Sequence, residues 1–145
     1  RDRAKQLLTD FADKFHSVDA YRAKVVGVTR TLGYVSTIKK RRRYLPDIKS
    51  RVASFRASAE RQAFNTRIQG SAADIIKLAM IRAYERIPKE ARLILTVHDE
   101  IVTLTPDSKV NETREAIREA MEGINFLQVP LVADIKIVQR WGEAK

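Results

Sequence analysis

The sequence predicts an α+β protein, with helices in its first half followed by an antiparallel sheet that carries helices on one face. Apolar residues recur at helical spacing over residues 4–32 and 53–87. β-Branched residues form two runs between residues 91 and 105, on either side of a short polar triplet. From residue 71 the predicted order is helix, strand, strand, helix, strand, which fits this fold class.

Composition indicates a globular domain that binds a polyanion. The 145 residues are 44% hydrophobic and 32% charged, enough for one domain with a real core. The net charge is +10, and nucleic acid is the usual partner of so basic a protein. Eleven basic but only two acidic residues lie between Arg30 and Arg67, so this segment carries most of the excess.

Composition also excludes several classes of protein. The sequence has no cysteine, which excludes disulfides and thiolate metal sites, and two histidines give poor support to a zinc site. No apolar run approaches the roughly 18 residues of a membrane span, and no secretory signal is visible. We therefore expect an intracellular protein without a membrane partner; bacterial cytoplasm, nucleus and organelle are not distinguished. The chain begins with Arg1 rather than Met, as a trimmed piece of a longer protein would.

The first two predicted helices carry packing residues and no chemistry. They cover residues 4–16 and 17–32, and Ser17 is the expected N-cap of the second. Gly33 follows where a helix C-terminus needs a left-handed residue. The apolar stripes are Leu7, Leu8, Phe11 and Phe15 in the first helix, and Tyr21, Val25, Val28 and Leu32 in the second.

A basic run follows a short predicted strand over residues 34–38. Lys39, Lys40 and Arg41–Arg43 are consecutive, and Pro46 marks a loop after them. Such a run is typical of a nuclear localisation signal, of a solvated loop, or of a clamp on a nucleic-acid backbone. Apolar residues on both sides indicate a fixed element, so we favour the clamp.

Polar residues form a row on the next predicted helix, over residues 53–67. Arg61, Asn65 and Gln69 follow one another at intervals of four, so they share one face. Guanidinium and amide groups can donate to the minor-groove acceptors that nearly all base pairs present. The alternative is a solvated polar face. Gly70 is expected to break the row, and Ser71 to begin a new helix with Asp74 three residues on.

The remaining predicted elements build the sheet and its cover. A helix ending near Pro88 precedes the hairpin at residues 91–105, and a further amphipathic helix covers residues 110–123. Residues 129–138 are expected to form a last strand, and Trp141 to dock the C-terminus.

The polar triplet at the bend of the hairpin is His98, Asp99 and Glu100. Unpaired carboxylates are costly inside a strand, so these side chains belong at the tip, facing water or a cation. Two carboxylates on a stiff hairpin are what a Mg²⁺ site for phosphoryl chemistry needs. The alternative is an ordinary solvated turn.

Four of these motifs together resemble the C-terminal part of family A DNA polymerases, the bacterial DNA polymerase I type. They are Arg41–Pro46, Glu60–Asn65, Gln69–Lys77 and Val97–Glu100, in matching order and separation. Trp141 also lies where that family has a tryptophan. The resemblance covers essentially the whole chain.

The resemblance implies a role for each motif. Asp99 looks like a catalytic metal-binding aspartate, with Glu100 its neighbour, and His98 is similar to the histidine that supports the primer terminus. The row of Arg61, Asn65 and Gln69 looks like the one that contacts template and primer through the minor groove. The arginines Arg41, Arg42 and Arg43 resemble a basic loop that helps to hold the DNA backbone.

The resemblance further implies the organisation and the activity. Residues 1–53 would be the distal part of the fingers and residues 54–145 the C-terminal part of the palm. The expected reaction is template-directed transfer of a dNTP to a primer 3′-hydroxyl, with Mg²⁺ or Mn²⁺ as cofactor and primer-template DNA as partner. The family's other catalytic aspartate and its nucleotide-binding fingers helix precede this chain, so we expect it to need an upstream segment. The alternative is a non-catalytic DNA-binding module.

One departure from the family concerns the basic loop. Lys40 stands where the family usually has glycine before the arginines, which raises the question of whether that loop bends differently.

Overall fold

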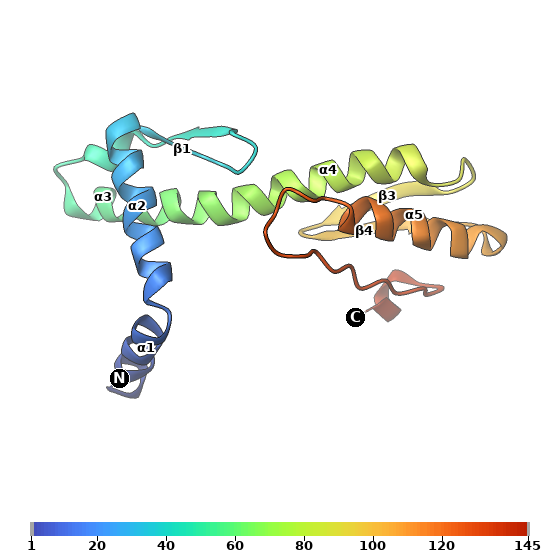
Figure 1. Cartoon of the computed structure of the whole chain (residues 1–145), viewed down its shortest axis with the longest axis horizontal. Coiled ribbons are helices and arrows are strands. Elements are labelled where there is room, and N and C mark those ends of the chain that lie inside the picture. The colour runs from blue at the N-terminus through green and yellow to red at the C-terminus, as the bar shows by residue number, and fades with distance from the viewer. Residues whose placement is uncertain (1, 145) are drawn as a thin grey trace. The chain divides into compact units, whose positions relative to one another are not determined.

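The computed structural model describes residues 2–144, and within them the side chain of Leu8 lies outside the description, as does our expectation for it. The chain forms two compact units, one ending at Ser71 and the other beginning at Ala72 (Figure 1). Among the described residues, no helix combines the length and the apolar character that crossing a membrane would require. Helices and antiparallel strands are both present, which confirms the α+β class.

The first unit begins with helices α1 (Asp2–Lys14) and α2 (His16–Leu32). The prediction that Ser17 caps the second helix is wrong, because α2 already starts at His16 and Phe15 takes the N-cap position without a side-chain cap. With a single residue between the two helices, no room remains for a separate polar cap. Gly33 has φ 77°, so the predicted left-handed C-terminus is confirmed.

The basic run forms half of a hairpin that the sequence did not predict. Strand β1 (Tyr34–Ser36) pairs antiparallel with β2 (Arg42–Tyr44), and Val35 faces Arg43 in the register. All three β2 side chains are exposed, so this strand lacks the apolar alternation by which strands are recognised. A 3₁₀ turn (Pro46–Lys49) follows, in agreement with the predicted break at Pro46.

The predicted helix break at Gly70 is wrong. Helix α3 (Ala53–Asn65) runs into a π-helical turn (Thr66–Gly70), and α4 (Ser71–Arg86) follows directly. Although α4 is counted from Ser71, this residue has φ −70° and ψ −39°, so the helical backbone continues through it without a break. Glycine is tolerated inside a helix at a modest cost in stability, and here packing against the neighbouring hairpin overrides that cost.

The core of the first unit lies between α2, the hairpin and α3. Its buried apolar residues include two alanines, which let the α3 backbone approach its neighbours closely. They are Val25, Val35, Leu45, Ile48, Ala59 and Ala63. In contrast, the apolar stripe of α1 is exposed: Leu7 is 62% and Phe11 is 55% exposed.

The second unit contains α4, the hairpin of β3 (Arg92–Val97) and β4 (Glu100–Leu104), and α5 (Val110–Glu122). The predicted hairpin is confirmed, with a bulge between Leu93 and Leu95. Arg82 of α4 donates to the carbonyl of Gly123 at 2.7 Å, just past the end of α5. Alanines and two isoleucines fill the interior: Ala79, Ala83, Ala91, Ile117, Ala120 and Ile124 are buried.

The last predicted strand is wrong, since residues 129–138 form no strand. Leu131, Ala133 and Ile135 are half-buried and the residues between them exposed, so the segment keeps the two-residue alternation of an extended chain without a pairing partner. Pro130 cannot donate to a ladder. Trp141 begins a short 3₁₀ turn and is 46% exposed, and its docking of the C-terminus stays a prediction.

Candidate nucleic-acid and metal-binding residues

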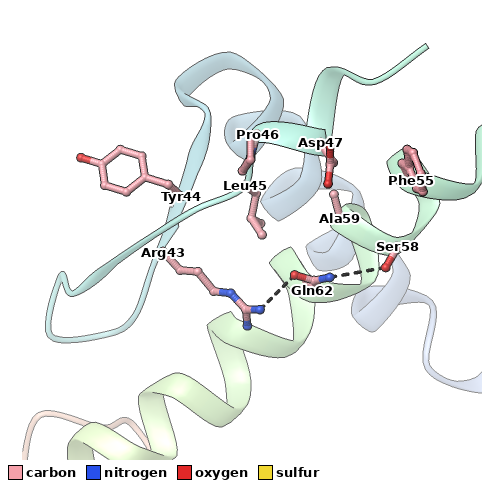
Figure 2. Close-up of a pocket in the computed structure, with 9 residues that line it drawn as sticks. All are labelled: Arg43, Tyr44, Leu45, Pro46, Asp47, Phe55, Ser58, Ala59 and Gln62. Atoms are coloured by element: carbon pink, nitrogen blue, oxygen red, sulfur yellow. Dashed lines mark hydrogen bonds between the residues drawn. The ribbon is translucent and has the colours of Figure 1, made fainter. Parts of the chain in front are cut away.

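The three arginines of the basic hairpin have unequal surroundings. Arg43 donates to Gln62 Oε1 at 2.9 Å (Figure 2). It also donates to Thr66 Oγ1 at 3.0 Å, so it joins β2 to α3 and the π turn. Arg41 donates to the Gly70 carbonyl at 3.1 Å, while Arg42 stacks 4.7 Å above the ring of Tyr34. All three side chains remain exposed, so they can still reach a phosphate, but two of them also hold the hairpin in place.

Lys40 lies in the turn of this hairpin, and its backbone conformation shows how the loop bends. Lys40 has φ 65°, the left-handed conformation that glycine adopts most easily. Its N–H donates to the Thr37 carbonyl, and the Thr37 N–H donates to the Arg41 carbonyl at 2.9 Å. This is the three-residue hairpin loop in which a left-handed residue completes the turn. The loop therefore keeps a backbone suited to glycine although lysine occupies the position.

The predicted polar row is present and open to solvent. Arg61 and Asn65 lie on α3 and Gln69 lies in the π turn, and all three side chains are exposed. They belong to the same compact unit as the basic hairpin. The unit therefore offers guanidinium and amide donors from one helical segment beside arginines from a neighbouring hairpin, an arrangement suited to a polyanion with minor-groove acceptors.

Arg67 is a further residue of this region that the sequence did not single out. Its guanidinium donates to the Ser36 carbonyl at 2.7 Å, to the Thr37 carbonyl at 3.3 Å and to the Tyr21 hydroxyl at 2.9 Å. It thus joins the π turn to β1 and α2. Its presence in a basic segment was visible, but its partners are 30 to 46 residues away and only the fold brings them together.

A small pocket lies beside the basic hairpin in the same unit. It measures about 170 Å³ and is lined by residues from β2, the 3₁₀ turn and α3. Arg43 and Gln62 form its polar side, and Gln62 also donates weakly to Ser58 at 3.4 Å (Figure 2). The Tyr44 ring points away from α3, so the aromatic side of the pocket is left to Phe55.

The acidic triplet lies in the turn of the β3–β4 hairpin. His98 and Asp99 form a two-residue loop, and Glu100 begins β4 opposite Val97. His98 has φ 53°, a conformation that non-glycine residues other than Asn, Asp and His seldom adopt. The Thr96 hydroxyl donates to the Glu100 carbonyl at 2.9 Å, which braces the loop. All three side chains of the triplet are exposed.

The triplet fits a hard divalent cation only as part of a larger site. Within residues 2–144 no group of three or more histidines, aspartates or glutamates is placed to hold a metal, so the triplet supplies at most two carboxylates. Mg²⁺ is usually held by one or two carboxylates together with substrate oxygens and water. Among the described residues, neither the Asp99 nor the Glu100 carboxylate forms an ion pair or accepts a hydrogen bond, so both can serve as ligands.

The predicted site residues thus fall into two groups. Arg41, Arg42, Arg43, Arg61, Asn65 and Gln69 belong to the first compact unit, whereas His98, Asp99 and Glu100 belong to the second.

The sequence model of DNA polymerase family A matches residues 1–143 of this chain. The chain is 41% identical over 143 residues to the thermostable DNA polymerase I of Thermus filiformis, and 42% identical over 148 aligned residues to the DNA polymerase I of Streptococcus pneumoniae. The alignments cover 98% and 100% of this chain but only 17% of each relative, so the chain spans about one sixth of their length.

A solved structure is similar as well. It is the POL domain of Pol1 from M. smegmatis in complex with DNA primer-template and dNTP. The TM-score is 0.84 and the sequence identity 41%, over 90% of this chain and 24% of that chain.

Proposed function

Because this chain belongs to DNA polymerase family A, we propose that it forms the C-terminal fingers and palm part of a template-directed DNA polymerase. In the proposed reaction, the 3′-hydroxyl oxygen of a primer attacks the α-phosphorus of a deoxynucleoside triphosphate. A new phosphodiester bond forms, the hydroxyl proton is released and pyrophosphate leaves. The observation that carries the proposal is the family match over residues 1–143, together with exposed carboxylates at the family's acidic motif that form no ion pair within residues 2–144.

Asp99 is the proposed catalytic carboxylate, and Glu100 is a neighbour with a smaller part. Asp99 lies in the loop itself, whereas Glu100 is the first residue of β4 and pairs with Val97. The two carboxylates would hold Mg²⁺ or Mn²⁺, which when bound neutralises charge at the reacting phosphate. His98, in the same loop, would support the primer terminus.

The first unit is the proposed DNA-binding part. Arg61, Asn65 and Gln69 would donate to minor-groove acceptors of the pair at the primer end, which tests the shape of the pair without reading its sequence. Arg41, Arg42 and Arg43 would contact backbone phosphates and so contribute most of the salt-dependent affinity. The division proposed from the family is fingers for residues 1–53 and palm for residues 54–145, whereas compactness alone divides the chain after Ser71.

We propose that an upstream segment, in the same or a separate chain, completes the enzyme. Large apolar side chains of α1 and α2 are exposed, more than a self-sufficient domain usually leaves uncovered. They include Leu7, Phe11, Val18, Tyr21, Val28 and Leu32, and Phe15 between the two helices is exposed as well. A neighbouring segment that buries this stripe would also supply the metal ligands that the described residues lack.

Reconstitution tests the proposal. Residues 1–145 are mixed with the segment that precedes the corresponding region in the relatives, and extension of a primer on a template is assayed with Mg²⁺. We expect extension only from the mixture, and none when Asp99→Ala replaces the native chain. Full activity of residues 1–145 alone would contradict the proposed need for an upstream segment, and unchanged extension by Asp99→Ala would contradict the proposed catalytic carboxylate.

The alternative, a non-catalytic DNA-binding module, predicts a different result. Such a module would bind duplex DNA equally well with Mg²⁺ and with a chelator, and its affinity would not depend on Asp99. A reconstituted mixture without extension, together with metal-independent binding, would favour this alternative.

A further inference from the structure

The π turn between α3 and α4 changes the geometry of the polar row. In an α-helix each residue advances by about 100°, so residues four apart drift by about 40°, and Gln69 would lie about 80° from Arg61. A π turn, whose hydrogen bonds join residues five apart, contains about one more residue than an α-helical turn, so each of its residues advances by a smaller angle. The π turn (Thr66–Gly70) therefore cancels most of this drift and returns Gln69 to the line of Arg61 and Asn65.

A π turn disturbs the helical hydrogen bonds, and Ser71 compensates for the disturbance. The Ser71 N–H donates to the Ile68 carbonyl, although an α-helix would direct it to the Arg67 carbonyl. The Arg67 carbonyl accepts instead from the Ser71 hydroxyl at 2.5 Å, and the same hydroxyl accepts from the Ile38 N–H at 2.9 Å. One side chain thus satisfies the displaced carbonyl and joins it to the turn of the basic hairpin.

Arg67 holds the turn from the other side. Its side chain lies toward the hairpin and donates to the Ser36 and Thr37 carbonyls, which belong to backbone that is itself fixed, since Thr37 is only 2% exposed. The backbone of Gly70 also rests on this turn: a Cβ at Gly70 would lie 2.8 Å from Thr37 Cγ2. The π turn is therefore supported by contacts outside its own helix.

We infer that Arg67, together with Ser71, is a positioning residue that holds the π turn and thereby aligns Gln69 with Arg61 and Asn65 for contact with the minor groove. The inference rests on the proposed DNA-binding function of this row. Arg67 contacts no DNA in this role; its charge is used inside the protein.

The test measures minor-groove contact and not affinity alone. The whole chain is titrated with a short duplex and with the same duplex carrying 3-deazaadenine, which lacks the N3 acceptor of adenine. We expect the natural duplex to bind about three- to tenfold more tightly. Gln69→Ala, Arg67→Met and Ser71→Ala should each lower this ratio toward one by a similar factor, and the double variant Arg67→Met with Gln69→Ala should lower it no further than Gln69→Ala does.

Arg51→Met is the matched control, because Arg51 is an exposed arginine of the same unit and its loss removes the same charge. Arg51→Met should weaken the binding of both duplexes equally and leave the ratio of the two affinities unchanged. Should Arg67→Met fail to fold, Ser71→Ala carries the test, since it removes one hydroxyl and no charge.

The outcomes separate the inference from the proposed function. A ratio that falls in Gln69→Ala but not in Arg67→Met or Ser71→Ala would overturn the inference alone. Additive losses in the double variant would do the same, because Arg67 would then contact DNA by itself. A ratio near one in the unaltered chain, insensitive to Gln69→Ala, would overturn the proposed minor-groove contact and the inference with it.

Discussion

The two hairpins of this chain share one backbone device and differ in how their charged residues are used. Each turn contains a non-glycine residue in the left-handed region, Lys40 with φ 65° and His98 with φ 53°. In the β1–β2 hairpin, Arg41 and Arg43 donate to Gly70, Gln62 and Thr66, and the turn is tied to Ser71. In the β3–β4 hairpin, Asp99 and Glu100 form no ion pair within residues 2–144.

The difference follows from the hydrogen-bonding chemistry of the two kinds of charged side chain. Arginine carries several donors, so one guanidinium can hold a hairpin and still present N–H groups to a phosphate. An ionised carboxylate only accepts, and a carboxylate intended for a metal must not be neutralised by a neighbouring cation. Substitutions in the first hairpin should therefore change stability and DNA affinity together, whereas substitutions of the acids in the second should change catalysis with little effect on folding.

The largest expected effect separates the two acids of the second hairpin. In the reconstituted polymerase, Asp99→Asn should lower the rate of single-nucleotide incorporation by about a thousandfold, because it removes a charged ligand at the reacting centre. Glu100→Gln serves as the control and should lower the rate by less than about tenfold. Both should unfold at the denaturant concentration of the native chain. Equal losses in the two variants would show that the carboxylates act as a pair.

The next effect concerns the close contact between the π turn and the first hairpin. Gly70→Ala should destabilise the chain by about 1–3 kcal/mol, because the new methyl group would meet Thr37 Cγ2 at 2.8 Å in a buried position. Denaturant unfolding measures the change. Thr37→Ser in the same chain should restore part of the loss, since it removes Cγ2 but keeps the hydroxyl that accepts from the Arg41 N–H.

Gly27→Ala is the matched control for that substitution. Gly27 lies within α2 with no atom within 4 Å of an added Cβ, so alanine should stabilise the chain there by about 0.5–1 kcal/mol. A stabilising Gly70→Ala would contradict the packing of the π turn on Thr37.

A smaller effect compares the two left-handed residues. Lys40→Gly and His98→Gly should each stabilise the chain by about 1 kcal/mol in thermal unfolding, because glycine adopts positive φ without the cost that other residues bear. Lys40→Ala removes the same charge without the conformational freedom of glycine, so it should not stabilise the chain. If His98 also supports the primer, His98→Gly should gain stability and lose incorporation rate, whereas Lys40→Gly should keep its rate.

The smallest expected effect distinguishes two neighbouring arginines. Arg43→Met should lower the free energy of unfolding by about 0.5–1 kcal/mol, since it removes the hydrogen bonds to Gln62 and Thr66. Arg42→Met should change stability less, because it loses one exposed contact with Tyr34. Both should reduce the salt dependence of DNA affinity by about one phosphate contact. Equal stability losses would contradict the unequal surroundings of the two side chains.

Much of this protein could be predicted from local patterns. The stripes of α1 and α2, the left-handed Gly33, and the hairpin with its acidic turn follow from residue type and spacing within a few residues, where backbone preferences act directly. Family membership could be predicted too, because it depends on the order and spacing of short motifs.

Other features depended on contacts between distant residues. β2 consists of exposed Arg42, Arg43 and Tyr44, and it is a strand only because β1 provides hydrogen-bond partners across the turn. Residues 129–138 have the better strand pattern and remain unpaired, since a strand needs a partner as well as a propensity.

By itself, the sequence determined the chemistry that this protein carries: acids at a turn, a row of donors on a helix, and a basic run. Only the tertiary structure decided that Gly70 lies inside a continuous helical segment, that a π turn follows Asn65, and that Arg67 and Arg43 hydrogen-bond to neighbouring elements. The physical reason is that residue type sets which hydrogen bonds a side chain can form. Which bonds it does form depends on partners that folding brings from 19 to 46 residues away.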